Sequence, residues 1–96
     1  MLLSIDTTNN LKTIVKLGKY KLEKTYSHPR EQEVLTLINQ IIKKAKVSLK
    51  NITEIRVNTG PGSYTGTRVG VAVANALAWS LGIKVNGKKM ELPKYE

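Results

Sequence analysis

The sequence predicts one small α/β domain with a mixed β-sheet. The chain has 96 residues, which leaves room for a single domain. Apolar and polar residues alternate in its first quarter, as in half-exposed strands, and two later stretches repeat apolar residues at helical spacing. Because helices that cross over between strands imply parallel pairing, the later strands should pair in parallel. The predicted order is β-β-β-α-β-α, and a last short strand remains open.

The first three elements are expected to form an antiparallel meander. Residues 2–7 are a short apolar run that ends in Asp-Thr-Thr-Asn-Asn, which indicates a buried strand followed by a turn. Residues 11–17 alternate between apolar and polar side chains and predict a half-exposed strand. A tight turn at Gly18 leads into a second alternating strand over residues 20–26.

Two helices are expected to follow. Pro29 suits the first position of a helix, and apolar residues recur at helical spacing from Val34 to Ala45. A short turn and a short strand then lead to a second helix from about Gly66 to Leu81, which Gly82 ends. We expect a lobe over residues 1–87 and a loose polar tail over residues 88–96.

Composition limits the class of protein. About 41% of the residues are apolar, which excludes the disordered class, and the chain has no cysteine for a disulfide or a thiolate metal site. The formal net charge of +9 favours contact with RNA, DNA or an acidic protein. An equally good interpretation is a lysine-rich, well-solvated surface.

The charge pattern also bears on location. Asp6 interrupts the apolar N-terminus, so no signal-peptide core forms. The longest uncharged run, residues 69–83, is too short and too rich in small residues to span a membrane. We therefore expect a cytoplasmic protein without a membrane partner.

A glycine-rich segment lies between the last predicted strand and the second helix. Glycines allow positive φ and close backbone approach, and free N–H groups at a helix start favour an anion. The Lys-Ser/Thr pair of a phosphate loop does not follow, and the spacing differs from that of a dinucleotide fingerprint. A tight strand-to-helix connection is the more common reason for such a segment.

The full segment has a specific resemblance. Residues 60–68 read Gly-Pro-Gly-Ser-Tyr-Thr-Gly-Thr-Arg, which resembles the Gly-Pro-Gly-Ser-Phe/Tyr-Thr-Gly-hydrophobic-Arg signature of the TsaB family, also called YeaZ. The opening Ile-Asp-Thr-Thr at residues 5–8 is similar to that family's N-terminus. The element order agrees as well, over roughly residues 1–87. The matching positions are Gly60, Pro61, Gly62, Ser63, Tyr64, Thr65, Gly66 and Arg68.

The resemblance implies an actin-like, ribonuclease-H-like lobe and a role in making threonylcarbamoyladenosine (t6A) on tRNA. It implies a non-catalytic scaffold that binds the catalytic subunit TsaD, in an assembly joined by the ATPase TsaE. It implies no intrinsic cofactor and no metal, a nucleotide only at the interface with a partner, and indirect or weak contact with tRNA. Family members commonly have a second lobe of similar fold. This chain is either a natural short form or a fragment, so functions that rest on the second lobe stay open.

The turn after the first strand could be a phosphate loop, as in actin-like ATPases, or a structural turn. Phosphate loops usually carry glycine, whereas Asp6, Thr7 and Thr8 are followed by two asparagines. We therefore favour a structural turn closed by the Asp6 side chain. The single histidine, His28, supplies too few ligands for a metal site. With no nucleophile, base and metal assembled, an ATPase or peptidase is the weakest hypothesis, behind a basic RNA-binding module.

The second helix is apolar on both sides, and such a helix needs cover on both. We expect the apolar face at residues 69, 72, 73, 76 and 77 to meet the sheet. The small residues Gly66, Gly70, Ala74 and Ala78 should face outward, with the apolar stripe of the first helix. Either the two helices cover each other, or they form an interface with TsaD or with a second copy of the chain. The expected interface residues are Val34, Leu35, Ile38, Ile41, Ile42, Gly70, Val71, Ala74, Asn75 and Ala78.

Overall fold

The structure, a computed structural model, describes residues 1–27 and 33–91. The predicted order of elements is confirmed. A short 3-10 helix, η2 (Leu49–Asn51), lies between the first helix and the last strand. The strands are β1 (Leu2–Asp6), β2 (Lys12–Leu17), β3 (Tyr20–Thr25) and β4 (Glu54–Val57), and the helices are α1 (Val34–Ala45) and α2 (Tyr64–Leu81).

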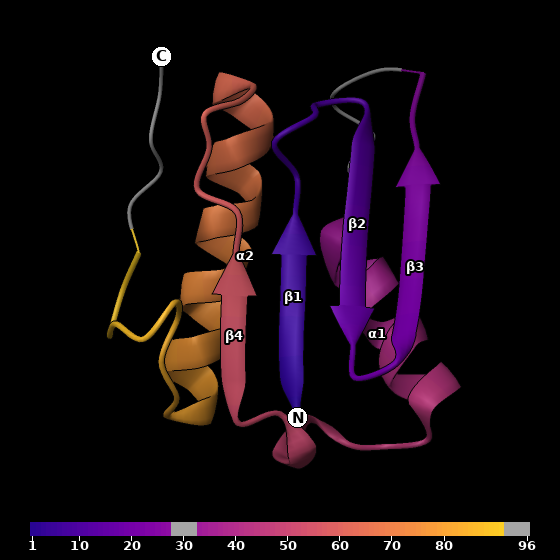
Figure 1. The fold of residues 1–96 in the computed structure, drawn as a ribbon, viewed down its shortest axis with the longest axis vertical. Helices are drawn as coiled ribbons and strands as arrows, with labels where there is room; N and C mark the ends of the chain where they lie inside the picture. The colour runs from indigo at the N-terminus through magenta and orange to yellow at the C-terminus, as the bar shows by residue number, and fades with distance from the viewer. Residues whose placement is uncertain (28–32, 92–96) are drawn as a thin grey trace.

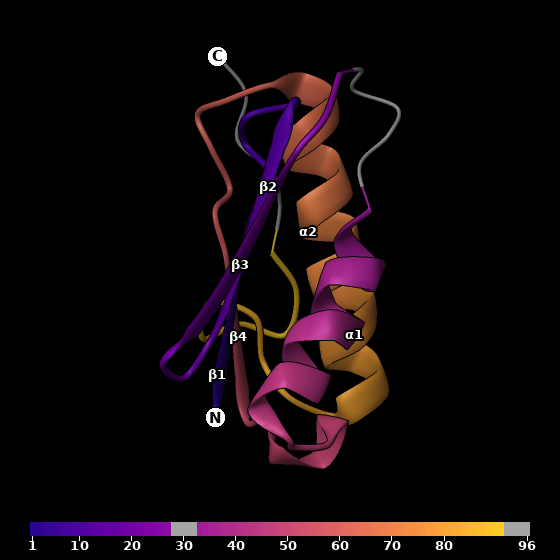
Figure 2. The same ribbon diagram turned by 90° about the vertical axis from the view of Figure 1, so that its right-hand side faces the viewer.

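The molecule has two layers. One four-stranded sheet has the order β3-β2-β1-β4 (Figure 1). β1 and β2 pair antiparallel, as do β2 and β3, whereas β1 and β4 pair in parallel. Both helices lie on the same face of this sheet (Figure 2). The mixed α/β architecture is that of an actin-like or ribonuclease-H-like lobe.

The core lies between the sheet and the two helices. Alternation places one set of strand side chains under the helices, among them Leu3, Val15 and Ile55, which are fully buried. Helix α1 adds Val34, Leu37, Ile38 and Ile41, which its 3.6-residue period brings to one face. The other face of the sheet carries polar and charged residues such as Ser4, Lys16 and Arg56, together with the apolar Ile14.

Helix α2 has the opposite orientation to the one predicted. Its small face is turned toward the sheet, and Gly70, Ala74 and Ala78 are buried. Its other apolar face looks outward, where Ala72 and Ala76 are exposed and the larger Val69, Val73 and Leu77 are half-buried. The physical reason is close approach, because small side chains let the helix backbone come near β1 and β4.

The ends of the helices agree with the sequence where the structure describes them. Ser63 caps α2 by accepting a hydrogen bond from the backbone N–H of Gly66. The helix therefore begins at Tyr64, two residues before the predicted start. Gly82 ends it in the left-handed conformation, as predicted. Pro29 and His28, at the predicted start of the first helix, lie outside the described residues. In the described part of the chain, no helix is long and apolar enough to cross a membrane.

Residues 83–91 return along the outer edge of β4. Val85 makes a parallel bridge to Ile55, so the last predicted strand is a single bridge and not an extended element. The expected loose tail is packed as far as Glu91, which is 8% exposed. The side-chain amide of Asn75 on α2 accepts a hydrogen bond from the Glu91 N–H and donates one to the Glu91 carbonyl oxygen, each at 2.8 Å.

Candidate functional site

The turn after β1 is closed by its own aspartate. The Asp6 carboxylate accepts hydrogen bonds from the Thr8 backbone N–H at 3.0 Å and from the Thr8 hydroxyl at 2.7 Å. Its other oxygen accepts a hydrogen bond from the Asn58 side chain at 3.1 Å. The structural turn predicted from the sequence is therefore present, and Asp6 also links the carboxyl ends of β1 and β4.

The environment of Asp6 keeps it ionised. Burial acts to raise the pKa of Asp6, but the hydrogen bonds from Thr8 and Asn58 and the nearby Lys16 ammonium together outweigh it. The pKa of the carboxyl group therefore lies below its ordinary value of 3.8. A carboxylate with this low pKa and three donors is suited to holding a turn, and poorly suited to accepting a proton at neutral pH.

The glycine-rich segment packs onto this turn. The backbone N–H of Ser63 donates a hydrogen bond of 2.7 Å to the Thr8 carbonyl oxygen. A Cβ at Gly62 would lie 2.6 Å from the Thr8 Cβ, closer than real side chains approach. Gly60 has a φ of 109°, in the region that favours glycine, and its N–H is bound by the Asn58 side chain. These contacts assign the segment a role in joining β4 to α2.

The first turns of α2 are buried on one side and exposed on the other. Gly66 and Thr67 are buried, whereas Pro61, Tyr64, Thr65 and Arg68 are exposed. On the exposed side the Arg68 guanidinium donates a hydrogen bond to the Tyr64 hydroxyl at 2.9 Å and lies over the Tyr64 ring. The motif thus has a buried half that fixes the fold and an exposed half at the start of α2.

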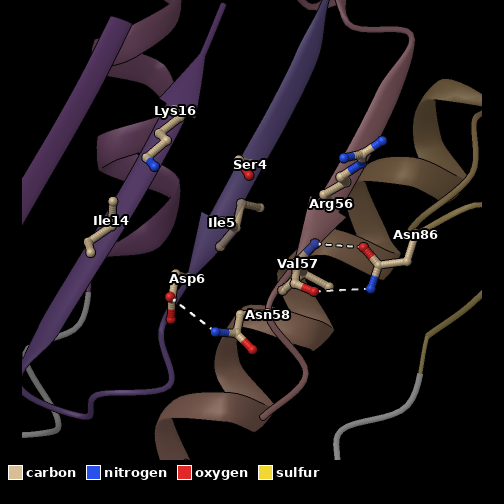
Figure 3. A pocket seen from close by; sticks show the side chains of 9 residues that line it. All are labelled: Ser4, Ile5, Asp6, Ile14, Lys16, Arg56, Val57, Asn58 and Asn86. Carbon is tan, nitrogen blue, oxygen red and sulfur yellow. Dashed lines mark hydrogen bonds between the residues drawn. The ribbon is translucent and has the colours of Figure 1, made fainter.

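A groove of about 310 Å³ lies on the open face of the sheet, at the carboxyl ends of β1 and β4 (Figure 3). Parallel register places Ser4 beside Arg56. Asn86 closes one side of the groove, where its amide makes hydrogen bonds with both the N–H and the carbonyl oxygen of Val57. The groove is lined by Ser4, Ile5, Asp6, Ile14, Lys16, Arg56, Val57, Asn58 and Asn86.

This groove combines polar and charged side chains with the apolar Ile5, Ile14 and Val57. It holds two cations, Lys16 and Arg56, and one carboxylate that is already engaged. In the described residues no group of three or more His, Cys, Asp and Glu could hold a metal ion. Of its residues only Asp6 was singled out in the sequence. The alternation of β1, β2 and β4 could have placed their lining residues on one face only with the strand register known, and Asn58 and Asn86 lie on no strand.

A second groove, of about 410 Å³, lies between the outer faces of α1 and α2. Its lining is almost entirely apolar, and Leu35, which α1 contributes, is 60% exposed. Trp79, on the outer side of α2, is 86% exposed. The groove is lined by Leu35, Ala72, Val73, Ala76, Leu77 and Ser80, which we call the helix groove.

The predicted interface residues fall mostly inside the fold. Among them Leu35 is exposed, and Ile42 and Asn75 are half-buried. The rest pack against the sheet within the same chain, so the prediction placed the outward face of α2 on the wrong side. The residues buried in this way are Val34, Ile38, Ile41, Gly70, Val71, Ala74 and Ala78.

The chain resembles proteins of tRNA modification. Residues 24–87 match the family described as TsaD, tRNA N6-adenosine threonylcarbamoyltransferase. The tRNA threonylcarbamoyladenosine biosynthesis protein TsaB of Bacillus subtilis is 30% identical over 89 residues, which are 88% of this chain and 39% of that protein. TsaB of Buchnera aphidicola from Schizaphis graminum is 28% identical over 90 residues, 91% of this chain and 43% of that protein.

Solved structures agree with the sequence relatives. The structure of YeaZ from Pseudomonas aeruginosa superposes with a TM-score of 0.71 at 28% identity, covering 88% of this chain and 41% of that chain. The chain therefore spans less than half the length of the relatives it matches. Since the family match covers more than half of the chain, the chain belongs to the family described as TsaD, within which its relatives are the TsaB (YeaZ) proteins.

Proposed function

We propose that the chain is a non-catalytic scaffold subunit in the biosynthesis of t6A on tRNA. In this proposal it binds a TsaD-like catalytic subunit through the outer faces of α1 and α2, in the cytoplasm. A TsaE-like ATPase joins the assembly, and a nucleotide binds only where the chain meets a partner. The named relatives that act in t6A biosynthesis support the pathway.

The helix groove is the observation that carries the proposal. Leu35 and the half-buried Val73 and Leu77 form a continuous apolar surface between the two helices. Exposed apolar patches of this kind usually mark protein interfaces. Ala72 and Ala76 have small side chains, so a helix of the partner could approach α2 closely at these positions. In the absence of its partner, the same surface would pair two copies of the chain about a two-fold axis.

The state of Asp6 supports a non-catalytic role. The carboxylate next to the glycine-rich segment is engaged by Thr8 and Asn58, which are parts of the fold itself. Its depressed pKa also opposes use as a general base at neutral pH. Asp6 therefore serves to align two strands, and the chemistry is left to the TsaD-like partner.

The test uses two arginine substitutions and a pull-down of the TsaD-like subunit from the same organism. Ala76→Arg places a charge in the helix groove and should weaken binding by about tenfold or more, which corresponds to roughly 1.4 kcal/mol. Gln40→Arg is the matched control, since Gln40 is exposed on α1 and lies about 140° around that helix from Leu35. It should bind as the wild type does.

Sedimentation gives a second measurement for the same variants. The isolated wild type should form dimers that Ala76→Arg dissociates into folded monomers. If Ala76→Arg binds the partner as strongly as Gln40→Arg does, the helix groove is not the interface and this proposal is wrong.

A further inference from the structure

Six lysines lie at one end of the molecule. They come from four separate segments: the β2–β3 turn, the end of α1 with the residue that follows it, the 3-10 helix η2, and the segment after α2. All six are exposed. This end is the lower one in Figure 1, where the N-terminus and the last turns of both helices also lie. We call it the basal surface, and its lysines are Lys19, Lys43, Lys44, Lys46, Lys50 and Lys84.

Contacts along the backbone bring these segments together. The Met1 side chain lies beside Gly18, the neighbour of Lys19. The Met1 amino group donates a hydrogen bond to the carbonyl oxygen of Asn51, the residue that follows Lys50. The carbonyl oxygen of Lys84 accepts a hydrogen bond from the N–H of Ile55, at the start of β4. Segments far apart in the sequence therefore form one surface.

Elsewhere on the molecule four lysines pair with carboxylates, whereas Lys16 and Lys89 make no ion pair among the described residues. On the open face of the sheet, Lys12 and Lys21 both pair with Glu23, at 2.9 and 3.1 Å. Lys24 pairs with Glu33 and Lys88 pairs with Glu91. Among the described residues, no ion pair joins a carboxylate to any of the six basal lysines.

One carboxylate, Glu54 at the start of β4, is near this end. It pairs with Arg56 at 3.1 Å, so its charge is already offset. The basal surface therefore gathers six lysines that make no ion pair among the described residues, whereas four of the six other lysines described there are paired.

The helix dipole accounts for part of this pattern only. Lysines in the last turn of a helix stabilise it by opposing its dipole, and Lys43 and Lys44 occupy that position in α1. Lys19, Lys50 and Lys84 lie in a turn, in a 3-10 helix and in the segment after α2. A helix-capping role does not explain why these three lie at the same end.

We propose that the basal surface binds the phosphate backbone of an RNA. Separated ammonium groups on flexible stems neutralise phosphates without reading sequence. The choice of RNA over other polyanions rests on the proposed function, in which the substrate of the assembly is a tRNA. The basal surface lies at the end opposite the glycine-rich segment (Figure 2). None of its six lysines lines the helix groove, so the two surfaces use different residues.

The test compares two triple variants that each remove three positive charges. Lys43→Gln/Lys50→Gln/Lys84→Gln changes the basal surface, and Lys12→Gln/Lys21→Gln/Lys88→Gln changes lysines that pair with carboxylates. Binding of labelled bulk tRNA is measured by anisotropy between about 50 and 200 mM salt. Thermal melts confirm that both variants are folded.

The basal variant should bind tRNA about tenfold or more weakly at low salt, and its slope of log affinity against log salt should fall in magnitude by about 2–3. The control variant should stay within about threefold of the wild type. Equal losses in both variants would show that net charge alone binds RNA, and the proposal would fail. It would also fail if the wild type bound no tRNA, or if it bound phosphatidylserine vesicles more tightly than tRNA through the same lysines.

Two cross-measurements separate this proposal from the scaffold function. The basal variant should still capture the TsaD-like subunit, because its substitutions lie outside the helix groove. Ala76→Arg should still bind tRNA with the wild-type salt dependence. If the subunit is not captured by any form of the chain while the basal variant alone loses tRNA, the scaffold proposal fails and RNA binding stands.

Discussion

The hydroxyl of Thr7 donates a hydrogen bond of 2.5 Å to the carbonyl oxygen of Gly66, in the first turn of α2. Thr7 is fully buried, and Gly70, one turn further along α2, lies directly against its side chain. This contact joins residues 59 positions apart in the sequence. It fixes which side of α2 faces the sheet, because only a face without large side chains can come this close.

Gly70→Val should therefore destabilise the fold. A Cβ at this position would overlap the Thr7 side chain, and overpacking of this kind costs about 1–3 kcal/mol. Urea unfolding followed by circular dichroism measures the change. Ala72→Val is the control on the exposed side of the same helix and should cost only about 0.5 kcal/mol. Equal unfolding midpoints for the two variants would mean that α2 does not pack closely on Thr7.

The contribution of Asp6 to stability should depend on pH. Its pKa in the folded chain is below the ordinary 3.8, so the charged form is stabilised by folding. The stabilisation is present above pH 3.8 and is lost as pH falls through the lower folded value. Asp6→Asn should thus be less stable than the wild type at neutral pH, and the difference should shrink as the pH falls below 3.8.

Glu23→Gln is the control for this pH experiment. Hydrogen bonds from Lys12 and Lys21 also lower the pKa of Glu23, but its carboxylate is exposed and screened by water. Its variant should unfold nearly as the wild type does across the same pH range. A stability difference for Asp6→Asn that stayed constant with pH would contradict the assigned role of the Asp6 charge.

Asn86→Gly should destabilise the outer edge of β4. The variant removes both hydrogen bonds between the Asn86 amide and the Val57 backbone, and a buried group left unpaired costs about 1–3 kcal/mol. Glycine is chosen because Asn86 has a φ of 52°, which glycine adopts without strain. Hydrogen exchange should show the Val57 amide exchanging faster. Asn39→Ala, on the exposed side of α1, should leave that amide unchanged.

Trp79 should report directly on partner binding. It is the single tryptophan of the chain and is 86% exposed, so its emission should match that of tryptophan in water. When a partner covers the helix groove, the emission should shift to shorter wavelength. Titration with a tryptophan-free form of the TsaD-like subunit measures the shift. An unchanged spectrum at saturation would place the interface away from the outer side of α2.

Much of the fold could be predicted from local patterns. The alternation of β2 and β3 and the helical spacing of α1 are strong signals because one face of each element is polar. Asp6 with Thr8 could be recognised as a turn since the hydrogen bond spans only two residues. These features depend on neighbours in the sequence.

The features that could not be predicted depend on distant residues. Helix α2 is apolar on both sides, so its periodicity does not tell which face meets the sheet, and the contact between Thr7 and Gly70 decides it. The groove on the open face requires the register that sets Ser4 beside Arg56. The basal surface likewise exists only once β1 and η2 are side by side.

The amide of Asn86 also affects how the chain meets other copies of itself. An unpaired strand edge can recruit another chain and start aggregation. At the β4 edge the Asn86 amide occupies the hydrogen-bonding groups of Val57, so a further strand cannot pair there. Within the described residues, β3 is the other edge of the sheet, and it carries Lys21, Glu23 and Lys24. Charged side chains on one edge and a side-chain amide on the other therefore keep this small sheet from growing by strand addition.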